Sequence, residues 1–158
     1  TPHGDMTLDI VDGLVQEDSL RISWKKGHES QFYWQADVPA DFSQMEQDGG
    51  ALVMEFMINK YPKGSVTQRM DCGWPCRGEI DVTEFYKSIP LRQRSKVGIS
   101  LSCFKKMGVD MKKITSPLVL VSKDEFEITF SDVRVIANAS EDNTIQLCDS
   151  EVATLLQD

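Results

Sequence analysis

The residues best suited to chemistry lie in the stretch from Met70 to Phe104, which holds three of the four cysteines. Cys72 and Cys76 stand four positions apart around a Gly-Trp-Pro sequence. Gly and Pro favour a tight turn, and a turn brings two Cα atoms within the roughly 4.4–6.8 Å that a disulfide needs. A disulfide is therefore one reading. Free buried thiols and a metal site are the others, and further metal ligands would have to come from Cys103, Cys148, His3 and His28.

A second kind of chemistry is the binding of sugars, whose apolar ring faces stack on Trp or Tyr. Trp74 lies between Gly73 and Pro75, where a side chain is hard to bury. We expect an exposed Trp74, with the segments around Tyr61, Arg69 and Arg77 framing the same surface. The alternative is that Trp74 folds back and caps one end of the domain. Trp24 and Trp34 lie in strand-like segments and are expected in the core or on a sheet face.

Catalytic chemistry is not predicted for this chain. Among its 25 acidic residues, Glu79 and Asp81 would share a face of an extended segment, but a solvated surface is the favoured explanation of that spacing. The two histidines, His3 and His28, lie in polar, loop-like settings without a nucleophile elbow. We therefore assign no catalytic residue.

Besides a metal site at the cysteines, the sequence brings a structural calcium ion into consideration. Carboxylates near the ends of expected strands are the candidate ligands, because calcium prefers carboxylate and carbonyl oxygens. No spaced motif supports them, and turn-forming acids are the simpler interpretation, so we assign no metal site. These carboxylates belong to Asp9, Asp12, Asp18 and Asp132.

Short segments with strand patterns must position these residues. Met6 to Val11 and Leu20 to Trp24 alternate apolar and polar residues, as half-buried strands do. Ala51 to Ile58 is a continuous apolar run that suits a strand buried on both faces. Further strands are expected at 31–36, 66–70, 97–101 with its continuation to Phe104, 118–121, 126–130 and 133–136, and a helix start at 81–85 capped by Thr83. Turns at such short intervals predict an all-β sandwich of about nine to ten strands with one or two short helices.

Length and charge limit the classes of partner. A chain of 158 residues predicts one domain over 1–158, with boundary tails at 1–5 and 149–158. Its net charge of −8 argues against nucleic acid and against an anionic membrane surface. No apolar run approaches the roughly 20 residues that span a bilayer. The start does not read as a signal peptide, so we expect a domain boundary there, with any targeting signal upstream.

The combined motifs resemble one bacterial family. These are Cys72-Gly-x-x-Cys76-x-Gly, Ile80-Asp-Val-Thr, Leu101-Ser-Cys-Phe and Gly108-Val-Asp. From about Leu8 to Cys148 the chain resembles the C-terminal, galactose-binding-like domain of glycoside hydrolase family 3 exo-β-glucosidases and β-glucan glucohydrolases.

The resemblance implies a galactose-binding-like jelly-roll sandwich, in a protein whose catalytic carboxylates lie in preceding domains. It implies an accessory role, in which the domain packs on the catalytic domains of the same polypeptide and helps to bind β-glucan or an oligosaccharide. It also implies periplasmic or secreted bacterial protein, where a disulfide would persist. A purely structural domain without sugar contact and a free-standing carbohydrate-binding module are the alternatives.

Overall fold

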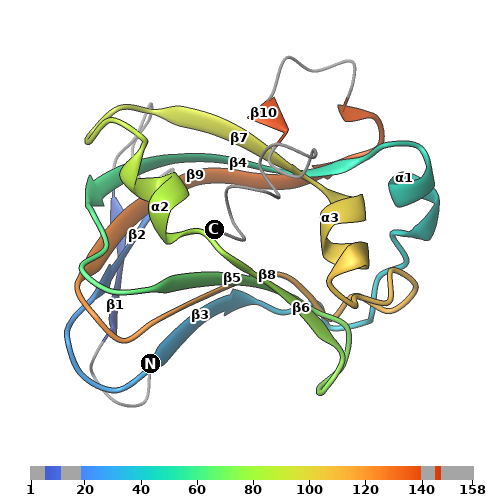
Figure 1. The fold of residues 1–158 in the computed structure, drawn as a ribbon, viewed down its shortest axis with the longest axis horizontal. Coiled ribbons are helices and arrows are strands. Elements are labelled where there is room, and N and C mark those ends of the chain that lie inside the picture. Colours follow the sequence, from blue (N-terminus) through green and yellow to red (C-terminus); the bar gives the residue numbers. More distant parts are fainter. Residues whose placement is uncertain (1–5, 12–18, 140–144, 147–158) are drawn as a thin grey trace.

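The chain folds into two β-sheets stacked face to face in a computed structural model that describes residues 6–11, 19–139 and 145–146 (Figure 1). The larger sheet has the spatial order β1 (Met6–Val11), β2 (Ser19–Trp24), β9 (Phe126–Ile136), β4 (Ala51–Lys60), β7 (Ser95–Ser100), β10 (Ile145–Gln146). The smaller sheet has the order β3 (Ser30–Trp34), β8 (Ser116–Ser122), β5 (Val66–Asp71), β6 (Arg77–Asp81). The predicted all-β sandwich is confirmed.

The sequence of the central strand β4 does not alternate between apolar and polar residues, because the first residues of the strand are buried on both faces. Its inward-facing residues, such as Met54 and Phe56, are fully buried between the sheets. Ala51 and Val53 face the other way and are buried as well, because Ala139 covers them in a second, smaller apolar cluster. Over residues 51–54 both faces of the strand are buried and every residue is apolar, as the run from Ala51 predicts, whereas Glu55 and Met57 on the outer face are half-buried.

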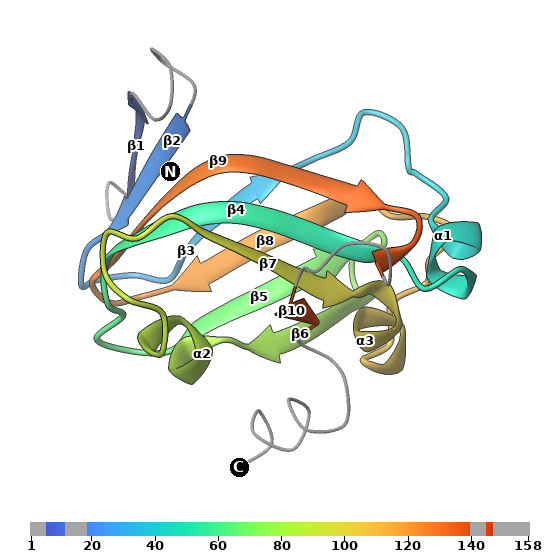
Figure 2. The same ribbon diagram turned by 90° about the horizontal axis from the view of Figure 1, so that it is seen from above.

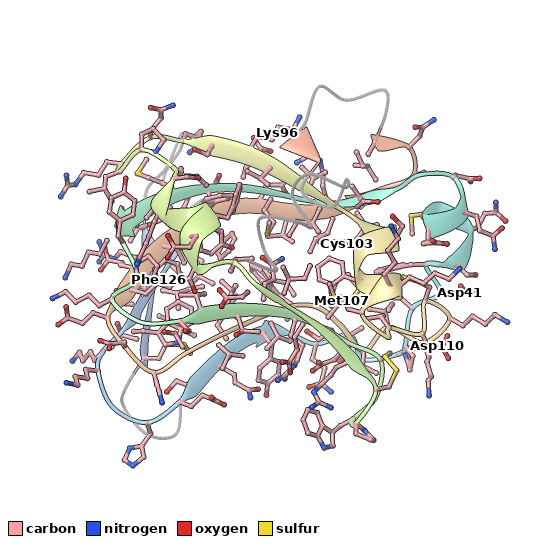
Figure 3. The ribbon with its side chains drawn as sticks, viewed as in Figure 1. Asp41, Lys96, Cys103, Met107, Asp110 and Phe126 are labelled. Carbon is pink, nitrogen blue, oxygen red and sulfur yellow. A yellow bond between two sulfur atoms is a disulfide. The ribbon has the colours of Figure 1, made fainter. Side chains whose placement is uncertain are left out.

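Three short helices accompany the sheets: α1 (Ser43–Gln47), α2 (Thr83–Lys87) and α3 (Leu101–Lys106). Figures 1 and 2 show α2 and α3 along one side of the sandwich, near the gap between the two sheets. Our expectation of one or two helices is therefore wrong. The segment Leu101–Phe104, expected as the end of a strand, is the start of α3, and Cys103 lies buried on it between the layers (Figure 3).

Helix α2 carries Tyr86 into the core. The Tyr86 ring centroid lies 5.6 Å from those of Phe56 and Phe126, and the hydroxyl donates a hydrogen bond to Gln68 Oε1 at 3.2 Å. Burial raises the pKa of the Tyr86 hydroxyl. Thr83 is not the cap that we expected: its backbone N–H donates to the Asp81 carboxylate at 2.9 Å, so the side chain of Asp81 satisfies the start of the helix.

Strand β9 joins two segments that we expected as separate strands. Ser131 and Asp132 do not end the strand, because the register against β4 shifts there by one residue: Phe56 pairs with Phe130 and Glu55 with Asp132. Ser131 is therefore the extra residue of a β-bulge. The polar pair marks an irregularity within one strand rather than a turn between two.

Some expectations fall outside the described residues. The boundary tails at 1–5 and 149–158, Asp12, Asp18 and Cys148 all lie there. Among the described helices, none is long and apolar enough to cross a membrane.

Candidate carbohydrate-binding face

The outer face of the four-stranded sheet carries the polar and aromatic side chains that are candidates for contact with a sugar. Strand pairing joins Tyr33 of β3 to Val119 of β8, Val119 to Arg69 of β5, and Arg69 to Glu79 of β6. Paired residues share a face, so this row runs across all four strands. Alternate residues of β5, including Val66 and Gln68, face the core instead and are fully buried.

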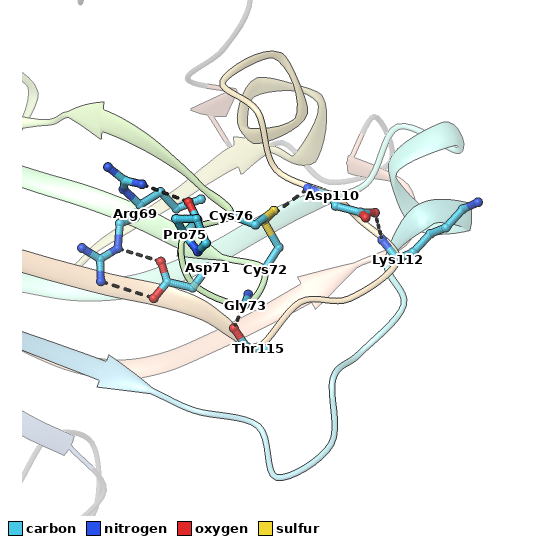
Figure 4. The surroundings of a disulfide bond; sticks show 10 residues. Arg69, Asp71, Cys72, Gly73, Pro75, Cys76, Asp110, Lys112 and Thr115 are labelled. Carbon is cyan, nitrogen blue, oxygen red and sulfur yellow. Dashed lines mark hydrogen bonds and ion pairs between the residues drawn. A yellow bond between two sulfur atoms is a disulfide. The ribbon is translucent and has the colours of Figure 1, made fainter.

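The turn between β5 and β6 is closed by a disulfide between Cys72 and Cys76, whose Cα atoms are 5.0 Å apart (Figure 4). The Cys72 N–H donates to the Cys76 carbonyl at 2.9 Å, and Gly73 takes a φ of 86°, a conformation that favours glycine. The Gly73 N–H donates to Thr115 Oγ1 at 3.1 Å, and the Asp110 N–H donates to Cys72 Sγ at 3.4 Å. The turn is thus held by its own bridge and by the segment before β8.

Trp74 projects from this turn and is 70% exposed. The guanidinium carbon of Arg77 lies 4.3 Å from the centroid of the indole ring, and that of Arg69 lies 5.5 Å from it. Both distances are within the range of cation–π attraction. The indole is therefore exposed to solvent yet supported by two arginines from adjacent strands.

The two arginines are themselves fixed by neighbouring groups. Arg69 is only 8% exposed and makes a two-pronged ion pair with Asp71, with Nε 2.7 Å from Oδ1 and Nη2 3.3 Å from Oδ2. Arg69 Nη2 also donates to Gln31 Oε1 at 3.2 Å. Arg77 donates through Nε to Glu79 at 3.1 Å and through Nη1 to the Pro75 carbonyl at 2.9 Å. Such bidentate geometry orients a guanidinium strongly.

The structure brings Trp74, Arg69 and Arg77 together but places Tyr61 elsewhere. Tyr61 follows β4 and donates its hydroxyl to the Ile89 carbonyl at 2.7 Å, beyond α2. The end of β4 and the turn after β5 lie at opposite ends of the sandwich (Figure 1). Tyr61 therefore does not share a surface with the other three, because β5 runs the length of the sandwich between them.

Sequence reasoning missed Tyr33. Its side chain is 52% exposed on the outer face, while Phe32, the residue before it, is buried. The alternation of Ser30 and Phe32 inward against Gln31 and Tyr33 outward was the available signal. The aromatic residues on both sides of Tyr33 made this alternation hard to recognise in the sequence.

Of the other two tryptophans, Trp24 lies in the core, whereas Trp34 lies on the edge strand β3 and is 37% exposed. Trp24 is buried, stacks on Phe126 at 5.3 Å and donates Nε1–H to the Ser30 carbonyl at 3.1 Å. Trp34 packs edge-on against Phe32 and Phe130 where the sheets diverge. There it lines a cavity of about 530 Å³ whose other lining residues are Ile10, Ser19, Leu20, Pro117, Phe130, Ser131, Asp132 and Val133.

The described carboxylates that we considered for calcium are engaged with arginines. Asp9 lies 3.6 Å from Arg21, and Asp132 pairs with Arg134. Across residues 6–11, 19–139 and 145–146, no group of three or more His, Cys, Asp or Glu side chains is arranged to hold a metal ion. Cys103, which we considered as a possible metal ligand, is disulfide-bonded.

Comparisons with known proteins agree with the fold. Residues 1–135 match the family model Exop_C, described as galactose-binding domain-like. The extra C-terminal domain of the exo-1,3/1,4-β-glucanase ExoP from a Pseudoalteromonas species superposes with a TM-score of 0.76 and 19% identity, covering 94% of this chain and 79% of that domain.

Two further structures are informative. The complete ExoP enzyme superposes with a TM-score of 0.74 and 20% identity over 91% of this chain, which spans only 17% of that enzyme. A family 30 carbohydrate-binding module from a cellulosomal cellulase of Clostridium thermocellum has a TM-score of 0.65 and 19% identity, covering 90% and 86% of the two chains. No curated protein sequence matches the chain.

Proposed function

The chain belongs to the Exop_C family of galactose-binding-like domains, and from that premise we propose that it is a non-catalytic accessory domain of an exo-β-glucanase. In this proposal the parent enzyme is a family 3 glycoside hydrolase that cleaves 1,3- or 1,4-linked glucose chains. The domain packs on the catalytic domains of the same polypeptide and contributes to binding the β-glucan or oligosaccharide.

The exposed Trp74 is the observation that carries the sugar-binding part of the proposal. An indole that is 70% exposed leaves an apolar ring face open for a sugar to stack on. Arg77 supports the ring, and the closed turn limits its motion, so little conformational entropy is lost when a sugar stacks on it.

Polar groups around Trp74 suit the hydroxyl groups of a neutral sugar. Glu79 and Asp71 offer acceptor oxygens on the same face, and Arg69 and Arg77 offer donors. Tyr33 lies three strands from Glu79, which corresponds to about 14 Å at the usual strand spacing. A short glucan chain laid across the strands spans that distance.

The similar solved structures support the role as an accessory domain. In the ExoP enzyme the matching region makes up 17% of a much longer chain, as expected for a domain appended to others. We also propose that the protein is exported to the bacterial periplasm or secreted. The Cys72–Cys76 bridge and the disulfide at Cys103 support this, because disulfides persist in oxidising compartments.

Affinity electrophoresis and calorimetry on the isolated domain, with laminarin, mixed-linkage β-glucan and cellohexaose, test the proposal. We expect the wild type to bind at least one of them and Trp74→Ala to lose that binding. Tyr61→Ala is the matched control, because Tyr61 is an aromatic away from the face, and it should bind as the wild type does. If neither the wild type nor the control binds any glucan, the domain is a structural one.

The sequence upstream of Thr1 in the gene tests the assignment to a longer enzyme. A family 3 catalytic region in the same reading frame is the expected result. A gene without catalytic domains would instead favour a free-standing carbohydrate-binding module, the alternative supported by the similarity to family 30 modules.

A further inference from the structure

A second concave surface lies on the opposite side of the molecule, on the outer face of the six-stranded sheet. It is a pocket of about 190 Å³. Its described lining residues are Val11, Ser19, Arg21, Phe56, Met57, Asn59, Arg94, Thr129 and Ser131. The pocket shares no residue with the face around Trp74.

Strand pairing places Arg21 at the pocket. Arg21 of β2 pairs with Thr129 of β9, which pairs with Met57 of β4, so the three side chains share the outer face. Arg21 also meets the carboxylate of Asp9, whose Oδ2 lies 3.6 Å from Arg21 Nη2, with both side chains about half exposed. Ion pairs of this kind contribute roughly 0–1 kcal/mol, so Arg21 remains able to bind another anion.

The β-bulge and the loop before β7 bring in a second arginine. Arg94 Nη1 donates to Ser131 Oγ at 2.9 Å, and Ser131 Oγ donates to the Glu55 carbonyl at 3.2 Å. The loop is held by the Arg92 N–H, which donates to the Ile58 carbonyl at 2.8 Å, and Arg92 takes a φ of 57°. A non-glycine residue in this conformation is uncommon, and such residues concentrate at functional sites.

Among the described residues that line the pocket, positive charges outnumber negative ones. Two guanidinium groups line it, and no Asp or Glu is among its described lining residues. Glu55 and Asp132, the acidic residues nearest the bulge in the strand register, are both paired with Arg134. Asn59 accepts a hydrogen bond from Thr129 at 2.7 Å through Oδ1, which leaves its amide nitrogen as a donor.

We propose that this pocket binds the oxyanion group of an acidic sugar, either a carboxylate or a sulfate ester. Arg21 and Arg94 supply charge-assisted hydrogen bonds to the anion. The thioether chain of Met57 offers an apolar surface for the sugar ring, and Asn59 and Thr129 offer polar partners for its hydroxyls. The inference does not rest on the proposed glucan binding, because it concerns a different face and different residues.

Titration of ¹⁵N-labelled protein at constant ionic strength tests the proposal, with D-glucuronate, D-glucose 6-sulfate and methyl β-D-glucoside as separate ligands. We expect one or both acidic sugars to shift the Nε–H signals of Arg21 and Arg94 and the amide signal of Ser131. The acidic sugar that binds more strongly identifies the anionic group. The neutral glucoside should leave these signals unchanged.

Variants connect the binding to the two arginines. Arg21→Gln and Arg94→Gln should each weaken the binding of the acidic sugar by about tenfold. This is the effect of losing one charge-assisted hydrogen bond. Lys87→Gln is the control, because it removes the same positive charge on α2. This variant should bind the acidic sugar as the wild type does. The proposal is overturned if neither acidic sugar shifts the signals, if the neutral glucoside shifts them equally, or if binding survives in the double variant. If the wild-type domain binds glucuronate but not laminarin, the result counts against the proposed glucan binding and leaves the proposal for this pocket standing.

Discussion

The guanidinium carbon of Arg77 lies 4.3 Å from the centroid of the Trp74 ring, so the most exposed aromatic of the four-stranded face rests on a cation from the next strand. Arg77 is in turn bound to Glu79 and to the Pro75 carbonyl. The indole therefore has a fixed support although solvent surrounds most of it. A fixed platform and a group that caps the core respond differently to substitution.

Trp74→Ala should remove glucan binding and leave folding almost unchanged. Because the side chain is 70% exposed, we expect the free energy of unfolding to change by no more than about 0.5 kcal/mol. Urea denaturation and glucan titration measure the two effects. Trp24→Ala is the contrasting variant: its indole is buried, and its loss should cost about 3–5 kcal/mol. A loss of that size at Trp74 would show that it caps the core.

Removal of the Cys72–Cys76 bridge should lower stability moderately. In the loop-closure model a ring this short contributes about 2 kcal/mol. The double variant Cys72→Ala/Cys76→Ala, compared with the wild type by urea denaturation, measures the contribution. Intact mass with and without reductant, on protein exported to the periplasm, checks that the bridge forms. Free thiols at both positions in exported protein would refute the assignment.

The isolated domain should hydrolyse no β-glucoside. Asp71, the acidic residue nearest Trp74 in the strand register, is in an ion pair with Arg69 at 2.7 Å, and Glu79 is in one with Arg77 at 3.1 Å. Asp81 binds the first turn of α2. An aryl β-glucoside assay on pure domain is the measurement. Turnover that disappears in Glu79→Gln or Asp81→Asn would contradict the accessory role.

Stability should fall above pH 10 because of Tyr86. Burial raises the pKa of this hydroxyl in the folded protein, whereas in the unfolded chain it titrates near its ordinary value of about 10. The contribution is fully present below pH 10, and it is lost as the pH rises from there toward the folded pKa, because only the unfolded chain then releases the proton.

Tyr86→Phe isolates that contribution. The variant lacks the hydrogen bond to Gln68, so at pH 8 it should be about 1 kcal/mol less stable than the wild type. The difference should shrink at pH 11, where the wild type carries the penalty and the variant does not. Urea midpoints at the two pH values give the comparison, and equal differences at both would contradict it.

The strands could be predicted because an alternation of apolar and polar residues marks β2 and a continuous apolar run marks β4. Two elements were misjudged for physical reasons. Leu101-Ser-Cys-Phe is too short to show a helical period, so α3 resembles the end of β7. Ser131-Asp132 resembles a turn, but a bulge tolerates polar residues within a continuous strand.

The candidate face could be predicted only where its residues are close in sequence. Trp74, Arg69 and Arg77 lie within one hairpin, so local reasoning brought them together. The pocket of Arg21 and Arg94 depends on the order of the strands in the sheet, which no local pattern reveals. Tyr61 was misplaced for the same reason, since nearness in sequence to β5 does not specify an end of the sandwich.

The Cys72–Cys76 disulfide fixes the hairpin independently of the side chain at position 74. Strands β5 and β6 meet at Cys72 and Cys76, and the backbone bond between these residues completes the hairpin without any contribution from the side chain at position 74. Residue 74 can therefore change without disturbing the sheet. In directed engineering, position 74 therefore offers a place where an exposed side chain can be exchanged while the hairpin beneath it keeps its shape.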